Sequence, residues 1–311
     1  MDKIAARFNV ATDHMRRGGK YVVARARPTA RRIELGAHLR HLRESVGLTI
    51  EDAARGMPFS ETKVQRVETG LQSFRQAREL RKLLERYGVT EDDAVEQLLE
   101  IQREASSQEW WTEYKDVMPS GMQRFVGIES AAKSIHVYHP TLVHGLLQTE
   151  AYARAVHEVF KPVEETTTEF VDKHVALRMG RKETLLAGEE APRLWVILGE
   201  GALRWVIGGS DVMCEQYDEI VKLAALDNIT VQVLPFQSRG YRATHDFALL
   251  DPGDGLPQMV QADTAWGAVS VTDKPREVKR FARSFDALRA SALPPEDTQG
   301  FLHRLTREIT Q

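Results

Sequence analysis

The stretch FSETKVQRVETG, residues 59–70, carries signals for both the start and the end of a helix. Ser60 is a favoured N-cap residue, and Gly70 can end a helix by adopting a left-handed backbone conformation. Val64 and Val67 are three positions apart, so in a helix both side chains point toward the same buried side. The stretch therefore predicts a short amphipathic helix from Ser60 to Thr69.

The polar side of this predicted helix has a distinctive composition. Glu61, Thr62, Lys63 and Arg66 face outward and lie toward the helix N-terminus. An ordinary solvent-exposed helix face is one interpretation. The other is a recognition helix, because such helices enter the major groove of DNA with their N-terminal residues.

The segment just before it predicts a second helix. Thr49 is a suitable N-cap, and Glu51 and Asp52 lie in the first turn, where the helix dipole favours negative charge. Ala53 and Ala54 are small enough for two helices to cross closely. The spacing of the two helices is that of a helix-turn-helix motif.

The rest of the chain divides into two parts. Further helices are expected at 33–46, 74–87 and 91–105, which gives a five-helix DNA-binding domain over residues 33–105. Residues 106–311 predict an α+β domain. Under the hypothesis of a DNA-binding regulator given below, this domain is expected to serve regulation, partner binding and dimerisation. Its expected helices are 123–138, 148–160, 165–187, 211–226, 275–291 and 295–310, and its expected strands are 193–198, 229–235, 246–251 and 258–262. The predicted fold class is mainly α, with a small β-sheet in the second domain.

Charge is unevenly distributed along the chain. Residues 1–82 hold 18 Lys and Arg against 9 Asp and Glu, whereas the remainder holds 24 against 36. A basic N-terminal part can concentrate near a polyanion. Residues 1–32 are predicted to be a flexible basic arm, which either stays solvated or adds contacts to DNA phosphates or a minor groove.

Other features narrow the function class. Cys214 is the only cysteine, so an internal disulfide and a cysteine-based zinc site are excluded. No long apolar run predicts a membrane span, and the N-terminus lacks the apolar segment of a secretory signal. We expect a cytoplasmic protein that associates with the nucleoid when bound to DNA.

Residues 35–86 resemble the XRE/Cro family of helix-turn-helix regulators in unbroken register. The resemblance implies that Glu61, Thr62 and Arg66 face base edges, and that Arg43 contacts a phosphate. Thr49 and Ser60, at the two helix N-termini, are further predicted phosphate contacts. Lys63 is expected to contact a phosphate, or alternatively a flanking base.

The second domain also resembles a known family. The segment ESAAKSIHVYHPTLVHGLLQTEAYARAV, residues 129–156, is similar to actinobacterial regulators of the WhiJ/AbaA type, which are related to antitoxins. The resemblance implies a small acidic partner protein encoded nearby, and a role in development or secondary metabolism.

No catalytic or metal-binding arrangement stands out, so neither an enzyme nor a cofactor is expected. His136, His139 and His144 lie close together in sequence but lack a further ligand at metal-binding spacing. Trp110, Trp111, Tyr114 and His144 are candidates for a partner surface or a pocket. The two tryptophans and the tyrosine alternatively seal the linker onto the core of the second domain.

The leading hypothesis is a dimeric, sequence-specific transcriptional regulator that binds double-stranded DNA and is controlled by a small protein. One alternative is a regulator that senses a small molecule, suggested by Trp195, Trp205 and Trp266. Another is an antitoxin-like protein that neutralises its partner and binds DNA to regulate its own gene.

Overall fold

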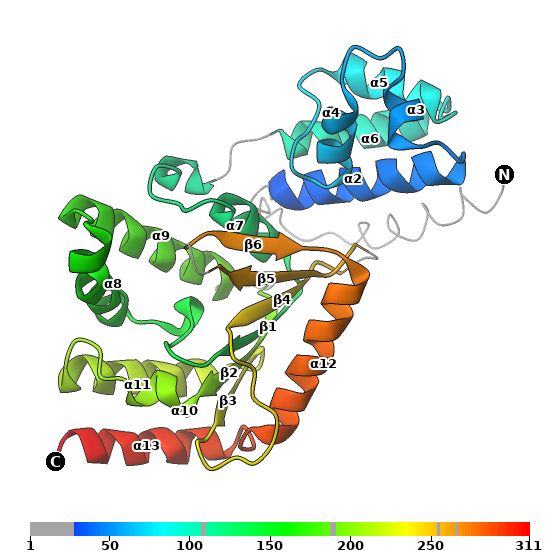
Figure 1. Cartoon of the computed structure of the whole chain (residues 1–311). Helices are drawn as coiled ribbons and strands as arrows, with labels where there is room; N and C mark the ends of the chain where they lie inside the picture. The colour runs from blue at the N-terminus through cyan, green and yellow to red at the C-terminus, as the bar shows by residue number, and fades with distance from the viewer. Residues whose placement is uncertain (1–27, 107–109, 187–190, 254–255, 265–266) are drawn as a thin grey trace, which may run out of the picture.

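The computed structural model describes residues 28–106, 110–186, 191–253, 256–264 and 267–311. A helical N-terminal part precedes a larger part built on a mixed β-sheet (Figure 1). The helices of the N-terminal part are α2 (Pro28–Ser45), α3 (Ile50–Ala54), α4 (Glu61–Glu68), α5 (Ala77–Arg86) and α6 (Asp92–Ala105). These are the five helices that the sequence predicts.

The first helix begins earlier than expected. The sequence predicts a flexible arm to residue 32, but α2 starts at Pro28, and proline is favoured at the first position of a helix. The prediction is therefore wrong for residues 28–32. The remainder of the predicted arm, residues 1–27, lies outside the described residues.

The N-terminal helices enclose one apolar core. α2 supplies Leu35 and Leu39, and α4 supplies Val64 and Val67, all of which are buried. The other buried members of this core are Ala53, Phe74, Leu80, Leu83, Leu84, Tyr87, Val95, Leu98 and Leu99. Burial of this apolar surface holds the short helices α3 and α4 in place, because isolated helices of that length are unstable in water.

The second part is organised around a six-stranded sheet in the order β3-β2-β1-β4-β5-β6. β1, β2 and β3 are parallel, whereas β4, β5 and β6 are antiparallel to their neighbours. The strands are β1 (Ser134–His139), β2 (Arg193–Gly199), β3 (Ile229–Leu234), β4 (Phe247–Asp251), β5 (Met259–Asp263) and β6 (Val269–Thr272).

The central strand β1 replaces the end of a predicted helix. The sequence predicts a helix over 123–138, but α7 (Met122–Ala131) ends before Ser134. Ile135 and Val137 point to one face of the sheet and pair with Leu194 and Val196 of β2. Tertiary pairing on both edges overrides the helical spacing, since each neighbouring strand satisfies one row of backbone groups.

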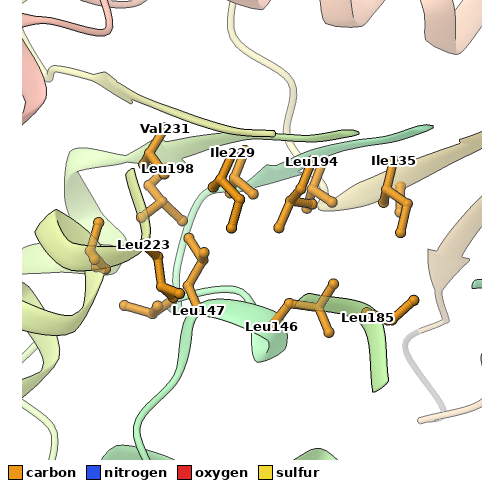
Figure 2. Close-up of a cluster of buried hydrophobic side chains, with 14 of the residues drawn as sticks. Ile135, Leu146, Leu147, Leu185, Leu194, Leu198, Leu223, Ile229 and Val231 are labelled. Atoms are coloured by element: carbon orange, nitrogen blue, oxygen red, sulfur yellow. The ribbon is translucent and has the colours of Figure 1, made fainter. Parts of the chain in front are cut away.

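Helices cover both faces of this sheet. Side chains of the strands, including Ile135, Leu194 and Ile229, meet Leu146 and Leu147 on one face (Figure 2). The helices that contribute to this core are α7, α8 (Glu150–Glu164), α9 (Thr168–Leu186), α11 (Ser210–Ala224) and α13 (Asp297–Ile309). On the other face α12 (Pro275–Ser291) packs through Val278, Phe285 and Leu288. Shorter helices are η2 (Trp110–Tyr114), η3 (Gly145–Leu147) and α10 (Glu200–Arg204).

α2 connects the two parts physically. Ile33, near its N-terminus, belongs to the apolar core of the second part, whereas Leu35 and Leu39 belong to the first. Thr29 packs against Gly127 of α7 so closely that a Cβ there would lie 2.5 Å from the Thr29 Cβ. The end of α2 that approaches α7 is visible in Figure 1. The helical part is therefore anchored on the second part through one shared helix.

Candidate nucleic-acid interface

The motif begins at α3, whose N-terminus is closed by a capping box. The Thr49 hydroxyl accepts from the backbone N–H of Asp52 at 3.0 Å, and the Asp52 carboxylate accepts from the backbone N–H of Thr49 at 3.2 Å. After α3 the chain turns through Gly56, which adopts φ +73°. Only glycine adopts this left-handed conformation without strain, so Gly56 sets the turn that leads to α4.

Both ends of α4 are fixed by local hydrogen bonds. The Ser60 hydroxyl accepts from the backbone N–H of Lys63 at 3.3 Å. At the other end Gly70 has φ +69°, its N–H donates to Val67, and the N–H of Leu71 donates to Arg66. This is a Schellman motif, and it confirms the predicted helix end at Gly70.

α2 lies directly against the C-terminal end of α4. A Cβ at Gly36 would lie 2.5 Å from the carbonyl oxygen of Val67 and 2.7 Å from that of Glu68. The glycine thus permits a backbone approach that no other residue allows. This contact, together with buried Val64 and Val67, determines the direction in which the opposite side of α4 faces.

That opposite side forms an exposed polar surface, which we call the α4 face, consisting of Glu61, Thr62, Gln65 and Arg66. All four residues are exposed. Their side chains form no hydrogen bond or ion pair within the described part of the chain. The α4 face is therefore a row of polar groups on a rigid helix, available to an external partner.

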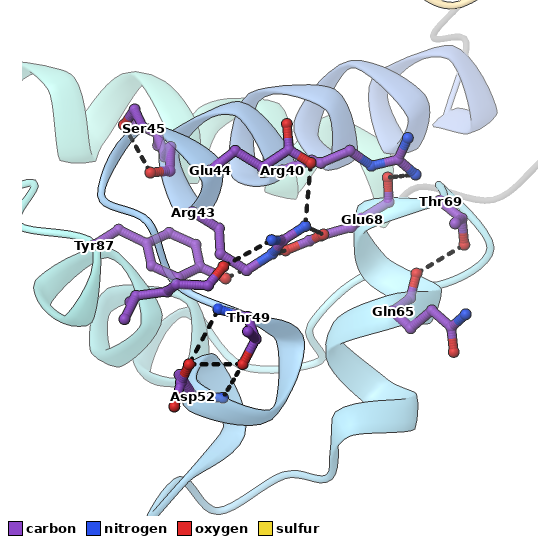
Figure 3. A network of polar contacts seen from close by, with 12 residues as sticks. Arg40, Arg43, Glu44, Ser45, Thr49, Asp52, Gln65, Glu68, Thr69 and Tyr87 are labelled. Carbon is purple, nitrogen blue, oxygen red and sulfur yellow. Dashed lines mark hydrogen bonds and ion pairs between the residues drawn. The ribbon is translucent and has the colours of Figure 1, made fainter. Parts of the chain in front are cut away.

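Gln65 was missed by the sequence prediction. It lies four positions after Glu61 and three after Thr62, which places it on the same helix face. That spacing was sufficient to identify it. In Figure 3 its side chain points away from the buried polar network behind α4, which consists of Arg43, Glu68 and Tyr87.

Arg43 lies in that network and not on the surface. Its Nε and Nη2 donate to the two carboxylate oxygens of Glu68, each at 2.8 Å, and its Nη1 donates to the carbonyl of Leu48 at 2.9 Å (Figure 3). Both residues are buried, and the Tyr87 hydroxyl donates to Glu68 at 3.3 Å. The expected phosphate contact of Arg43 is contradicted, because the protein itself occupies its guanidinium donors.

The other predicted phosphate contacts differ in how available they are. The hydroxyl of Thr49 pairs with the carboxylate of Asp52 at 2.7 Å, and these hydrogen bonds lower the pKa of Asp52. A phosphate at Thr49 would meet that negative charge, so the Thr49 prediction fits the structure poorly. Ser60 is exposed, and its hydroxyl is an acceptor in the cap, which leaves its own hydrogen available for donation.

Lys63 turns away from the α4 face. Its Nζ donates to the carbonyl of Ser73 at 2.9 Å and lies 5.5 Å from the ring centroid of Phe74. It lines a hollow of about 610 Å³ beside α4. The hollow is lined by Arg32, Lys63, Leu71, Gln72, Ser73, Arg75, Ala105 and Ser106, with no carboxylate among them.

The candidate aromatic site of the second part belongs to its packing. Trp111 is buried in the core, and Trp110 contacts Trp111 and Tyr114 edge to face. The Trp110 ring also lies against Gly180 of α9, where a Cβ would come within 2.9 Å of it. These contacts favour the interpretation in which the aromatic residues seal the linker onto the core.

The remaining candidates are dispersed. Trp195 donates to Gln232 at 2.8 Å beneath α12, and Trp205 is 47% exposed after α10. Trp266 lies outside the described residues.

Within the described residues no group of three or more His, Cys, Asp or Glu is arranged to hold a metal ion. No helix among them is long and apolar enough to cross a membrane.

His144 is buried at the N-terminus of η3, with its Nδ1 lacking a hydrogen-bond partner among the described residues. Burial lowers the pKa of its imidazole well below the usual value, and neighbouring His139, Arg181 and Arg178 add to this effect. The imidazole is therefore neutral near pH 7.

Comparison with protein families agrees with this architecture. Residues 34–98, which include α3 and α4, match a family described as "Helix-turn-helix domain". This match supports a DNA-binding regulator. Residues 122–304 match a family described as "Domain of unknown function (DUF5753)". No curated protein and no solved structure matches the chain. The chain therefore belongs to the DUF5753 family and carries a helix-turn-helix domain in front of its family domain.

Proposed function

We propose that this protein is a sequence-specific transcriptional regulator that inserts α4 into the major groove of double-stranded DNA. The observation that carries the proposal is the α4 face. Its polar side chains are exposed and unpaired within the described residues, whereas the helix beneath them is capped at both ends and locked by Gly36. A rigid helix with unused polar groups is suited to reading base edges.

Each residue of the α4 face has a chemical preference among bases. Arg66 can donate two hydrogen bonds to guanine O6 and N7. The Gln65 amide can accept from adenine N6 through its oxygen and donate to adenine N7 through its nitrogen. Glu61 can accept from cytosine N4. Thr62 can donate a hydrogen bond or contact the methyl group of thymine.

Phosphate contacts would surround this face. Ser60 and the N-terminus of α4 suit one phosphate, since backbone N–H groups at a helix start attract anions. Lys63 and Arg75 line the carboxylate-free hollow beside α4 and suit a second. Arg75 is exposed and forms no ion pair within the described residues.

Dimerisation belongs to the same proposal. One helix of this length reads only a few base pairs, and helix-turn-helix proteins commonly bind two half-sites one helical turn apart as dimers. Regulation would enter through the second domain, because α2 packs in both cores. Control by a small acidic protein, a WhiJ/AbaA-like or antitoxin-like relationship, an actinobacterial developmental role and a cytoplasmic location rest on the sequence alone.

The proposal is tested by selecting bound sequences from random DNA with the full chain. We expect one enriched motif, and we expect Arg66→Ala to lose selectivity at one position of each half-site, at a cost of about 1–3 kcal/mol. Arg283→Ala is the matched control, since Arg283 is exposed on α12. Selection of the same motif with the same affinity by Arg66→Ala would overturn the assignment of this residue.

A further inference from the structure

Four basic side chains meet where β1 ends. His139 is the last residue of β1, His144 precedes η3, and Arg178 and Arg181 lie on α9. We call this group the Arg–His cluster. It lies at the carboxyl end of a strand in the parallel part of the sheet, which is where open α/β sheets bind ligands.

The two arginines of the cluster differ in whether their positive charge is paired with a carboxylate. Arg181 is buried and forms a two-pronged ion pair with buried Glu129, with both N–O distances 2.8 Å. Among the described residues, the hydrogen bond that Arg178 donates goes to the neutral amide oxygen of Gln148. Within the described residues no carboxylate lies within ion-pair distance of Arg178. Arg178 therefore has no ion pair of its own among these residues.

The surroundings of Arg178 make its positively charged form less stable than that of an exposed arginine. Burial, followed by repulsion from Arg181, lowers the pKa of Arg178 to about 10. The charge of Asp263, on β5, opposes this shift and raises the pKa of Arg178. Asp263 accepts a hydrogen bond from Gln261, and burial and the charge of Asp246 raise its pKa. Arg178 is half-buried. A partly desolvated guanidinium with unused donors is stabilised when an anion binds to it.

The histidines supply further donors at the same place. The two rings are 6.5 Å apart between centroids. His139 Nδ1 accepts from the backbone N–H of Leu142, so in the neutral ring its Nε2 carries the hydrogen. His144 is more than nine-tenths buried, and its Nδ1 has no partner among the described residues. Such orphaned buried groups call for a physical explanation.

Gly145 leaves space beside both guanidinium groups. A Cβ at this position would lie 3.8 Å from Cδ and Nε of Arg178 and 3.9 Å from Nη1 of Arg181. Alanine would fit there in ordinary contact, whereas a longer side chain would extend over the arginines.

We propose that the Arg–His cluster binds an oxyanion, the carboxylate or phosphate group of a small molecule, with Arg178 as the main ligand and His139 and His144 as additional donors. A planar guanidinium with free donors matches the geometry of such groups. The site is formed entirely within the second domain. Binding at this site can therefore be measured in the absence of DNA.

The proposal is tested without DNA, by titrating the full chain with inorganic phosphate and separately with succinate in a calorimeter at constant ionic strength. We expect saturable binding of at least one probe, and Arg178→Gln should weaken it about tenfold or more, as expected for loss of a charge-assisted hydrogen bond. Preference for phosphate assigns a phosphoryl ligand, and preference for succinate assigns a carboxylate.

Two further variants keep the test decisive. Arg283→Gln, an exposed arginine on α12, should bind like the unmodified chain. Gly145→Leu retains all four basic residues but covers the arginines, so it should also lose binding. It serves as the test if Arg178→Gln does not fold. Dissociation constants weaker than about 10 mM for both probes, or equal binding by Arg178→Gln, would overturn the proposal.

Discussion

At the scale of single residues, the ion pair with Glu68 gives Arg43 a structural role inside the protein. Sequence comparison placed Arg43 at a phosphate-contacting position, but its partner lies 25 residues away. No local pattern could indicate that pairing, since it depends on how α2 meets α4. The caps at Thr49 and Ser60, in contrast, were predictable because each cap bonds to a residue three positions further on.

This ion pair provides a prediction about stability. Glu68→Ala should lower the free energy of unfolding by about 3–5 kcal/mol, because it leaves the buried guanidinium of Arg43 without its carboxylate. The double variant Arg43→Met/Glu68→Leu should lose much less, since it removes both charges. Urea denaturation of the full chain measures both values.

The same double variant also tests the corrected role of Arg43. If Arg43 is structural, the salt dependence of DNA affinity should be unchanged in Arg43→Met/Glu68→Leu. A flatter dependence on salt would instead show that Arg43 contacts a DNA phosphate.

At the scale of elements, the contact between α2 and α4 depends on Gly36. Gly36→Ala should destabilise the protein by about 1–3 kcal/mol and weaken DNA binding, because its Cβ would force apart two helix backbones. Gly300→Ala on α13 is the control. Its Cβ would meet nothing within 4 Å, so it should be neutral or stabilising by about 0.5–1 kcal/mol. Thermal unfolding and DNA titration would check both variants. Equal behaviour would contradict the close packing.

Hydrophobic periodicity along the sequence predicted some elements of this fold and failed for one strand. Helices with strong caps or amphipathic stripes, such as α4 and α6, were predicted within a few residues. β1 was not, because Ile135 and Tyr138 also fit the helical spacing that begins in α7. Only pairing with β2 and β4, which are distant in sequence, resolves the ambiguity.

At the scale of the whole molecule, buried histidines make stability depend on pH. Burial is the largest cause that lowers the pKa of each histidine in this group: His38, His136, His139, His144, His157 and His174. The unfolded chain binds protons near pH 6.5, whereas the folded chain binds them only at lower pH. Their contribution to stability is therefore complete above pH 6.5 and is lost as the pH falls.

We expect the free energy of unfolding to decrease between pH 7 and pH 5 in urea titrations. His157, whose pKa is lowered to about 3, should contribute substantially, so His157→Leu should reduce the decrease. A free energy that stays constant or rises on acidification would show that these histidines are not held neutral by burial.

At the same scale, one helix joins the two parts of the chain. α2 packs in both cores, and α7 carries both Gly127, which contacts α2, and Glu129, which binds Arg181. The sequence predicted two domains but could not identify this shared helix, because Ile33 and Leu35 look alike in any hydrophobic pattern. Their different cores follow from their positions on opposite sides of α2.

The central claim is that the α4 face reads bases, and a double-mutant cycle between protein and DNA tests it most directly. The affinities of the unmodified chain and of Arg66→Ala are measured for the selected DNA site and for the same site with the candidate guanine replaced by 7-deazaguanine, which lacks N7. We expect the two changes to be coupled, with an interaction energy of about 1–3 kcal/mol. Strictly additive effects at every guanine of the site would contradict the claim.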